Sequence, residues 1–104
     1  MMQKKLHGTT YDTDAAVFIG RYINGTPGAP DYWRADLYRS RRAGRYFLAG
    51  QGGALSRFAQ SAGKNTWAEG DDILPLTEAE ALAWAVHFLD AGTVKQYFPE
   101  HAQA

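Results

Sequence analysis

Apolar positions near the start of the chain recur with the period of a helix. Residues 12–23 contain apolar side chains at spacings of three and four, which is typical of a helix with one apolar face. These side chains are Ala15, Phe18, Ile19 and Tyr22. Asp12 or Thr13 would cap the free N–H groups, and the loop 24–30, with two prolines and two glycines, would end the helix. We therefore expect an N-terminal helix over 12–23.

Alternating positions follow in the middle of the chain. Residues 32–40 alternate between two sets of side chains, which predicts a strand with two different faces. Residues 45–49 would form the returning strand. The turn between them, 41–44, ends in Gly44, which can adopt the positive φ that a tight hairpin requires. This part of the chain predicts an antiparallel hairpin.

The segment after the hairpin has a weaker pattern. The glycine-rich run 50–53 predicts a break in regular structure. Residues 54–61 fit either a short helix or an irregular crossing, and the pattern does not decide between them. Residues 65–67 and 71–76 indicate a further short strand.

The strongest helix signal lies near the end of the chain. Thr77 and Glu80 have the spacing of a capping box, and an apolar run follows them directly. Its apolar side chains are Ala81, Leu82, Trp84, Ala85, Phe88 and Leu89. They cover more than half of the helix circumference, which predicts deep packing. Residues 91–92 would close this helix, and a second capping-box pattern at 93–96 would start a short last helix that Pro99 ends.

These elements predict a small α+β fold. We expect one domain over 1–104, ordered at about 4–98, with an antiparallel sheet of about three strands. The N-terminal helix and a C-terminal helix pair would pack on that sheet. The longest apolar run, 15–20, is far shorter than the about 20 residues that span a bilayer, so we expect a soluble protein with no membrane partner.

Composition excludes several kinds of chemistry. The chain has no cysteine, which removes disulfides, thiolate zinc sites and cysteine nucleophiles. His7, His87 and His101 lack metal-ligand spacing, and the run 50–53 lacks the Lys-Ser/Thr of a P-loop. We therefore expect a protein without catalytic residues, metal or cofactor. Eleven basic and eleven acidic residues cancel, so no global field draws the chain to nucleic acid.

Basic charge is concentrated in the predicted hairpin, here called the arginine–aromatic hairpin. Its members are Tyr32, Trp33, Arg34, Tyr38, Arg39, Arg41, Arg42 and Arg45. Arginine beside aromatic residues suits phosphate binding, base stacking or a protein-binding hot spot. The alternative is a solubilising hairpin whose arginines keep an edge strand from pairing with other chains.

Acidic charge is concentrated further along, in what we call the acidic segment. Its members are Glu69, Asp71, Asp72, Glu78 and Glu80, and no basic residue stands among them. Such a segment could dock on the nucleic-acid-binding surface of a protein by replacing phosphates. The alternative is that these acids have no binding role. It applies most directly to Glu78 and Glu80, because acidic residues are common in the first turn of any helix.

Several fragments occur together in a recognisable order. They are 11–15 (YDTDA), 37–39 (LYR), 44–48 (GRYFL), 50–53 (GQGG), 67–70 (WAEG), 73–81 (ILPLTEAEA) and Trp84. Over residues 6–98 the chain resembles a family of small, mostly uncharacterised proteins from phages and bacterial mobile elements. It departs from the family pattern at Gln51 and Asp71, where the pattern has Glu.

Some members of that family are similar to anti-CRISPR proteins. The resemblance implies a non-enzymatic inhibitor in the bacterial cytoplasm that binds a host CRISPR–Cas effector and blocks its DNA binding or cleavage. It implies no catalytic residues. The alternative is a small nucleic-acid-binding accessory or regulatory protein that uses the arginines at 39, 41, 42 and 45 on phosphates. The high aromatic content is compatible with a homodimer.

Overall fold

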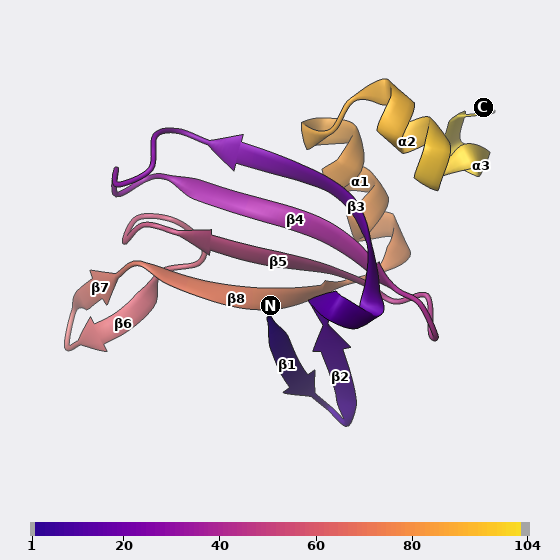
Figure 1. Cartoon of the computed structure of the whole chain (residues 1–104). Helices are drawn as coiled ribbons and strands as arrows, with labels where there is room; N and C mark the ends of the chain where they lie inside the picture. Colours follow the sequence, from indigo (N-terminus) through magenta and orange to yellow (C-terminus); the bar gives the residue numbers. More distant parts are fainter. Residues whose placement is uncertain (1, 103–104) are drawn as a thin grey trace.

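The computed structural model describes residues 2–102, with side chains for residues 2–100. Eight strands precede three helices along this part of the chain (Figure 1). The elements are β1 (Gln3–Leu6), β2 (Thr9–Asp12), a 3-10 turn (Thr13–Ala15), β3 (Ala16–Asn24), β4 (Trp33–Ser40), β5 (Tyr46–Gly52), β6 (Gln60–Gly63), β7 (Thr66–Ala68), β8 (Gly70–Leu76), α1 (Glu78–Phe88), α2 (Ala91–Tyr97) and α3 (Pro99–Ala102). The α+β class is confirmed.

The strands form one main sheet and two small hairpins. The main sheet has the order β3-β4-β5-β8, and all of its neighbours are antiparallel. The pairs β1-β2 and β6-β7 stand apart from it as two-stranded sheets. The expectation of about three strands was therefore too low, because the short hairpins and the long first strand of the main sheet were not recognised.

The expected N-terminal helix over 12–23 is wrong, because most of that segment is strand β3. A bulge between Phe18 and Gly20 inserts one extra residue opposite β4. As a result Ile19 and Tyr22, three apart, both pack in the core under the helices. The bulge thus converts the two-residue period of a strand into a spacing of three, which imitates a helix.

The two faces of the main sheet are covered unequally. On one face, α1 and α2 bury the larger core, which includes Leu37, Leu48 and Trp84. On the other face, the β1–β2 hairpin covers a smaller core around Phe47 and Ile73. In Figure 1, α1 lies behind the sheet and the β1–β2 hairpin lies below β8 in the view. The hairpin is too small to cover the whole of its face, so part of the sheet stays open.

The hairpin predicted at 32–49 is confirmed, but the expected break at 50–53 is wrong. Strand β5 continues to Gly52, and residues 54–58 form turns and a bend rather than a helix. The glycines serve close packing. A Cβ at residue 50 would lie 2.6 and 2.7 Å from the Cε1 and Cε2 atoms of Phe58, so only glycine lets this buried ring lie against β5.

The helix ends follow local chemistry. The predicted capping box is present: the Thr77 N–H donates to Glu80 Oε1 at 2.8 Å, and the Glu80 N–H donates to Thr77 Oγ1 at 3.1 Å. The last helix starts earlier than expected, because Asp90 rather than Thr93 is its cap. Pro99 does not end the helical region but begins α3, where its fixed φ suits the first turn. No helix within residues 2–102 is long and apolar enough to cross a bilayer.

Candidate functional site

The acidic segment is divided between two places. Glu69 and Asp71 stand near the start of β8, whereas Glu78 and Glu80 lie beyond its end. The seven residues of β8 separate the two groups by about 20 Å. Asp72 is already paired, because its Oδ1 lies 2.6 Å from Lys4 Nζ. At the start of β8, Glu69 and Asp71 are therefore the members of the acidic segment that take part in neither ion pair of the described side chains.

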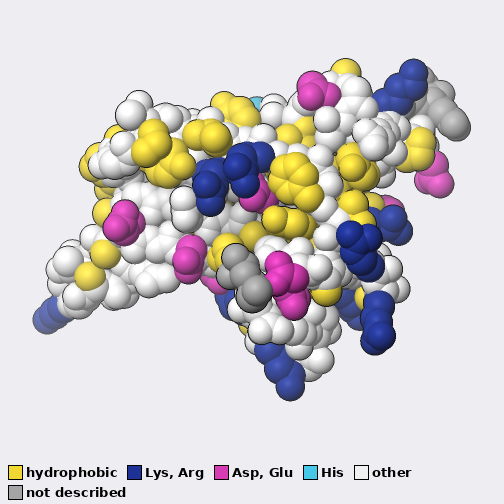
Figure 2. Space-filling view, in the orientation of Figure 1, with side chains coloured by type: hydrophobic (Ala, Val, Ile, Leu, Met, Phe, Trp, Pro, Cys, Tyr) yellow, Lys and Arg dark blue, Asp and Glu magenta, His cyan; other side chains and the backbone are white. Residues whose placement is uncertain are grey.

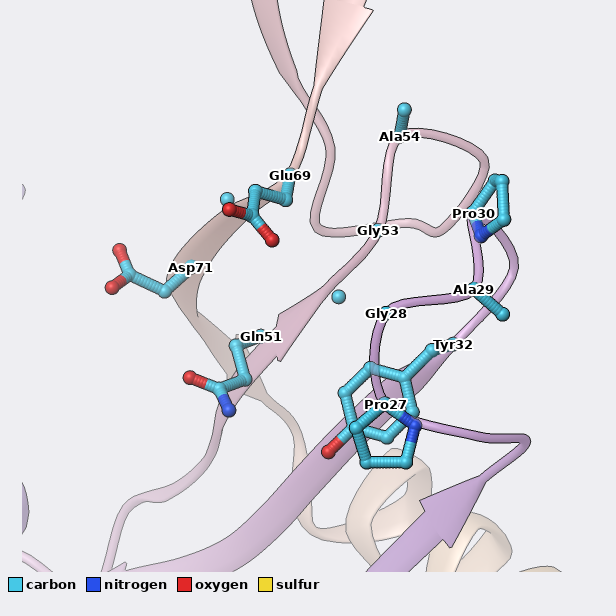
Figure 3. A pocket seen from close by; sticks show the side chains of 12 residues that line it. Pro27, Gly28, Ala29, Pro30, Tyr32, Gln51, Gly53, Ala54, Glu69 and Asp71 are labelled. Carbon is cyan, nitrogen blue, oxygen red and sulfur yellow. The ribbon is translucent and has the colours of Figure 1, made fainter.

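Glu69 and Asp71 border a hollow of about 680 Å³ at the end of the sheet, here called the acidic groove. Its other boundaries are the β3–β4 loop at 27–30, Tyr32, and the end of β5 with the turn after it, 51–54. In Figure 3, Glu69 points toward the middle of the hollow, Asp71 lies along its outer edge, and Tyr32 stands on the opposite side. The groove therefore has an acidic side and an apolar side.

The apolar side is held by backbone contacts. The Gly53 N–H donates to the Tyr32 carbonyl at 2.8 Å, and the Leu55 N–H donates to the Pro30 carbonyl at 2.8 Å. A Cβ at residue 53 would come within 2.6 Å of the Ala29 carbonyl oxygen, so this approach requires glycine. The predicted glycine run thus positions the groove.

The chemistry of the acidic groove suits a lysine or arginine side chain. The long apolar stem of such a residue can lie along Tyr32 and the prolines, while its charge meets Glu69 and Asp71. The ion pairs among the described side chains are Lys4–Asp72 and Arg21–Asp36. Neither involves Glu69 or Asp71, so both carboxylates are available to a cationic ligand.

The aromatic members of the arginine–aromatic hairpin do not form one surface. Trp33 packs edge-on against Phe88 on the helix-covered face, with ring centroids 5.3 Å apart. Tyr38 stacks on Phe47 on the opposite face, with centroids 5.4 Å apart. Burial raises the pKa of the Tyr38 hydroxyl. Tyr32 lines the acidic groove. The alternation of β4 separates these rings, so they do not provide a continuous platform for stacked bases.

Most of the arginines, in contrast, stay together at the other end of the sheet. We call Arg39, Arg41, Arg42 and Arg45 the arginine turn. The first three line a second hollow of about 330 Å³ at the β4–β5 turn. Arg34 is separate, since its register partners are Ile23 on β3 and Gln51 on β5, at the groove end of the sheet. Because β4 and β5 are central strands, the interpretation that these arginines protect a sheet edge is wrong.

An ion pair that sequence reasoning missed lies between β3 and β4, with Asp36 buried and the Arg21 side chain 47% exposed. Arg21 Nε donates to Asp36 Oδ1 at 2.7 Å, and Arg21 Nη2 donates to Asp36 Oδ2 at 3.0 Å. The hydrogen bond to Asp36 raises the pKa of the Arg21 guanidinium. The two residues are register partners, so the pair could have been found if 16–24 had been interpreted as a strand.

The same face carries exposed apolar side chains. Phe18 is 47% exposed and Ile23 is 52% exposed, although both are large apolar residues. We call the surface of Phe18, Arg21, Ile23 and Arg34 the open sheet face. Figure 2 shows this side of the molecule, where dark blue basic side chains near the middle adjoin yellow apolar ones. Arginine and large apolar groups together are typical of protein-binding surfaces.

Within the part of the chain that the structure describes, no three His, Cys, Asp or Glu side chains gather as metal ligands would. His87 packs edge-on against Phe88 with ring centroids 4.4 Å apart, and His7 lies in the β1–β2 turn. Comparison of the chain with protein-family models, curated proteins and solved structures finds no match.

Proposed function

We propose that this chain is a non-enzymatic protein-binding domain that inhibits a host CRISPR–Cas effector. In this proposal a phage or mobile element encodes the protein, and it occupies the basic surface on which the effector binds DNA. The CRISPR–Cas partner comes from the sequence resemblance described above. The observation that supports binding to a basic surface is the acidic groove, with its unneutralised Glu69 and Asp71.

The groove has the properties that a basic protein surface would need in its partner. Its volume of about 680 Å³ is large enough for one or more side chains. A DNA-binding surface presents lysines and arginines, whose charges attract the carboxylates and steer the encounter. The apolar side at Tyr32 adds contact area, which charge alone would not supply.

The open sheet face extends the same contact. Arg34 and Asp71 belong to one row across β4, β5 and β8, so the groove continues directly onto this face. Phe18 and Ile23 would lose their exposed apolar area to water when a partner covers them. The acidic groove would thus set the orientation of the bound partner, and the open sheet face would increase the affinity for it.

The test uses charge reversal in the groove. Tagged protein is incubated with host lysate and nuclease, and captured proteins are identified by mass spectrometry. The purified effector is then assayed for DNA binding in the presence of the protein. Because a close interfacial charge pair contributes about 1.5 kcal/mol or more, Glu69→Lys with Asp71→Lys should weaken inhibition at least about tenfold.

A matched variant separates the groove from net charge. Asp14→Lys with Glu100→Lys makes the same charge change at two exposed positions that do not line the groove. This control should inhibit as the wild type does. Full inhibition by the groove variant, or equal loss in the control, would refute docking through the acidic groove. Capture of no effector subunit would refute the CRISPR–Cas partner.

A further inference from the structure

We propose that the arginine turn is a second binding site, which takes the phosphate groups of a nucleic-acid backbone. The site lies at the β4–β5 turn, at the right-hand end of the sheet in Figure 1, while the β3–β4 loop that lines the acidic groove lies at the left-hand end. The eight residues of β4 separate these ends by about 25 Å. This inference goes beyond the proposed function, because neither site needs the other.

The turn that carries the arginines is held by several hydrogen bonds. The Ser40 N–H donates to the Arg45 carbonyl at 2.8 Å, and the Gly44 N–H returns to the Ser40 carbonyl at 3.1 Å. The Ser40 hydroxyl also accepts from the Arg45 N–H at 2.9 Å. The Arg41 N–H also donates to the Ala15 carbonyl at 3.3 Å, and this hydrogen bond links the turn to the residue that precedes β3. The exposed side chains of residues 41 and 42 therefore project from a fixed backbone.

One guanidinium is also held in place. Arg39 lies over the Tyr46 ring, with its Cζ 5.8 Å from the ring centroid. Its Nη2 would be only 3.1 Å from a Cβ at residue 44, so the glycine there leaves the space that this guanidinium uses. A prepositioned guanidinium loses little side-chain freedom when it binds an anion. Arg39, Arg41 and Arg42 then line one hollow of about 330 Å³.

The charge of this cluster is not neutralised by any ion pair among the side chains of residues 2–100. Neither ion pair among the described side chains includes an arginine of the turn. The whole chain is neutral, so the turn is a local excess of positive charge rather than part of a basic protein. Guanidinium groups bind phosphate oxygens through paired hydrogen bonds, which makes phosphate the favoured anion for such a hollow.

A nucleic-acid backbone fits better than an isolated phosphate. Three guanidiniums around one hollow, with Arg45 next to them, can contact several phosphates of a chain at once. The hollow itself is lined by no aromatic ring, so the site would read the backbone and not the base sequence. The acidic groove at the far end would keep the rest of the molecule away from the phosphates.

The test measures how binding depends on salt. Binding of the full chain to a short labelled DNA duplex is followed by fluorescence anisotropy between about 50 and about 200 mM salt. Four phosphate contacts predict a loss of affinity of about 100-fold over this range. In Arg41→Ala with Arg42→Ala, two contacts remain, so the loss should fall to about tenfold, with weaker binding at low salt.

Arg57→Ala with Lys64→Ala is the matched control, because it removes the same charge at two exposed positions outside the turn. It should bind with the salt dependence of the wild type. An absence of binding at low salt, or an unchanged salt dependence in the Arg41/Arg42 variant, would overturn the proposal. Displacement of the duplex by inorganic phosphate at constant ionic strength would show a free-phosphate site instead of a nucleic-acid site.

The same variants keep this inference separate from the proposed function. The Arg41/Arg42 variant should still inhibit the effector if inhibition depends on the acidic groove. The Glu69/Asp71 variant should still bind the duplex. Loss of both activities in either variant would show one shared surface and overturn the assignment of two sites.

Discussion

The contact between Gly50 and Phe58 allows a sharp test of how the glycine run shapes this protein. Phe58 is 2% exposed and lies in the same core as Leu48 and Trp84. In Gly50→Ala, the new Cβ would lie 2.6 and 2.7 Å from ring carbons of Phe58. Carbon atoms pack at about 3.5–4 Å, so the ring must move by about 1 Å. The mutation therefore tests whether this ring can move.

The expected cost follows from the crowded geometry. Overpacking of this severity should lower the free energy of unfolding by about 3 kcal/mol. Phe58→Ala removes a buried ring and should cost about 4 kcal/mol. If the two changes were independent, the double variant would lose about 7 kcal/mol. Because Phe58→Ala creates the space that the Cβ needs, we expect the double variant to lose only about 4–5 kcal/mol, a coupling of about 2–3 kcal/mol.

The assay is urea unfolding followed by tryptophan fluorescence and circular dichroism, with all four proteins compared at one temperature. Phe58→Leu supplies a second double-mutant cycle if Phe58→Ala does not fold, since it replaces the ring that meets Gly50 with a smaller apolar side chain. Additive losses in both cycles would refute the reasoning. The result matters for the site because residues 52–54, which follow this contact, line the acidic groove.

Three further predictions concern the ion pair, the turn and a helix cap. Asp36→Asn should lower the free energy of unfolding by about 2 kcal/mol, because it weakens the paired hydrogen bond to Arg21 at a position only 7% exposed. Urea unfolding measures this loss. A loss no larger than that of Arg21→Gln would contradict the role of Asp36 burial. Gly44→Ala should cost about 1–2 kcal/mol, because residue 44 has a φ of 65°; an unchanged melting temperature would contradict this. The N–H of Thr77 lowers the pKa of Glu80 below its ordinary 4.5, so the stabilisation by this carboxylate should be present above pH 4.5 and lost as the pH falls through the lowered pKa. The free energies of unfolding of Glu80→Gln and of the wild type, measured across this pH range, should converge at low pH. A difference that stays constant with pH would contradict the stabilising role of the Glu80 carboxylate.

The sequence alone determined the elements whose signals are local. The hairpin at 32–49 was predictable because alternation, a short turn and Gly44 all lie within a few residues of one another. The helix that begins at Glu78 was predictable because Thr77 and Glu80 make their hydrogen bonds within one turn. The concentration of arginines at 39–45 was likewise visible, since neighbours in a turn stay neighbours in space.

Only the tertiary structure decided the features that depend on distant partners. Residues 16–24 form a strand because β4 supplies their hydrogen bonds, and a bulge gave their apolar positions the spacing of a helix. The glycine run continues β5 because β4 and β8 pair with it on both sides, and the glycine at residue 50 leaves the space that Phe58, eight residues further along the chain, occupies.

The charged surfaces show the same division. The length of β8 separates Glu69 and Asp71 from Glu78 and Glu80, although the sequence places them in one segment. Lys4 neutralises Asp72 from the far end of the chain. The β3–β4 loop and the end of β5 complete the acidic groove around the two remaining carboxylates. A local pattern reports which residues have a given charge, but strand pairing decides which of those charges meet, because pairing brings together residues that are far apart in the chain.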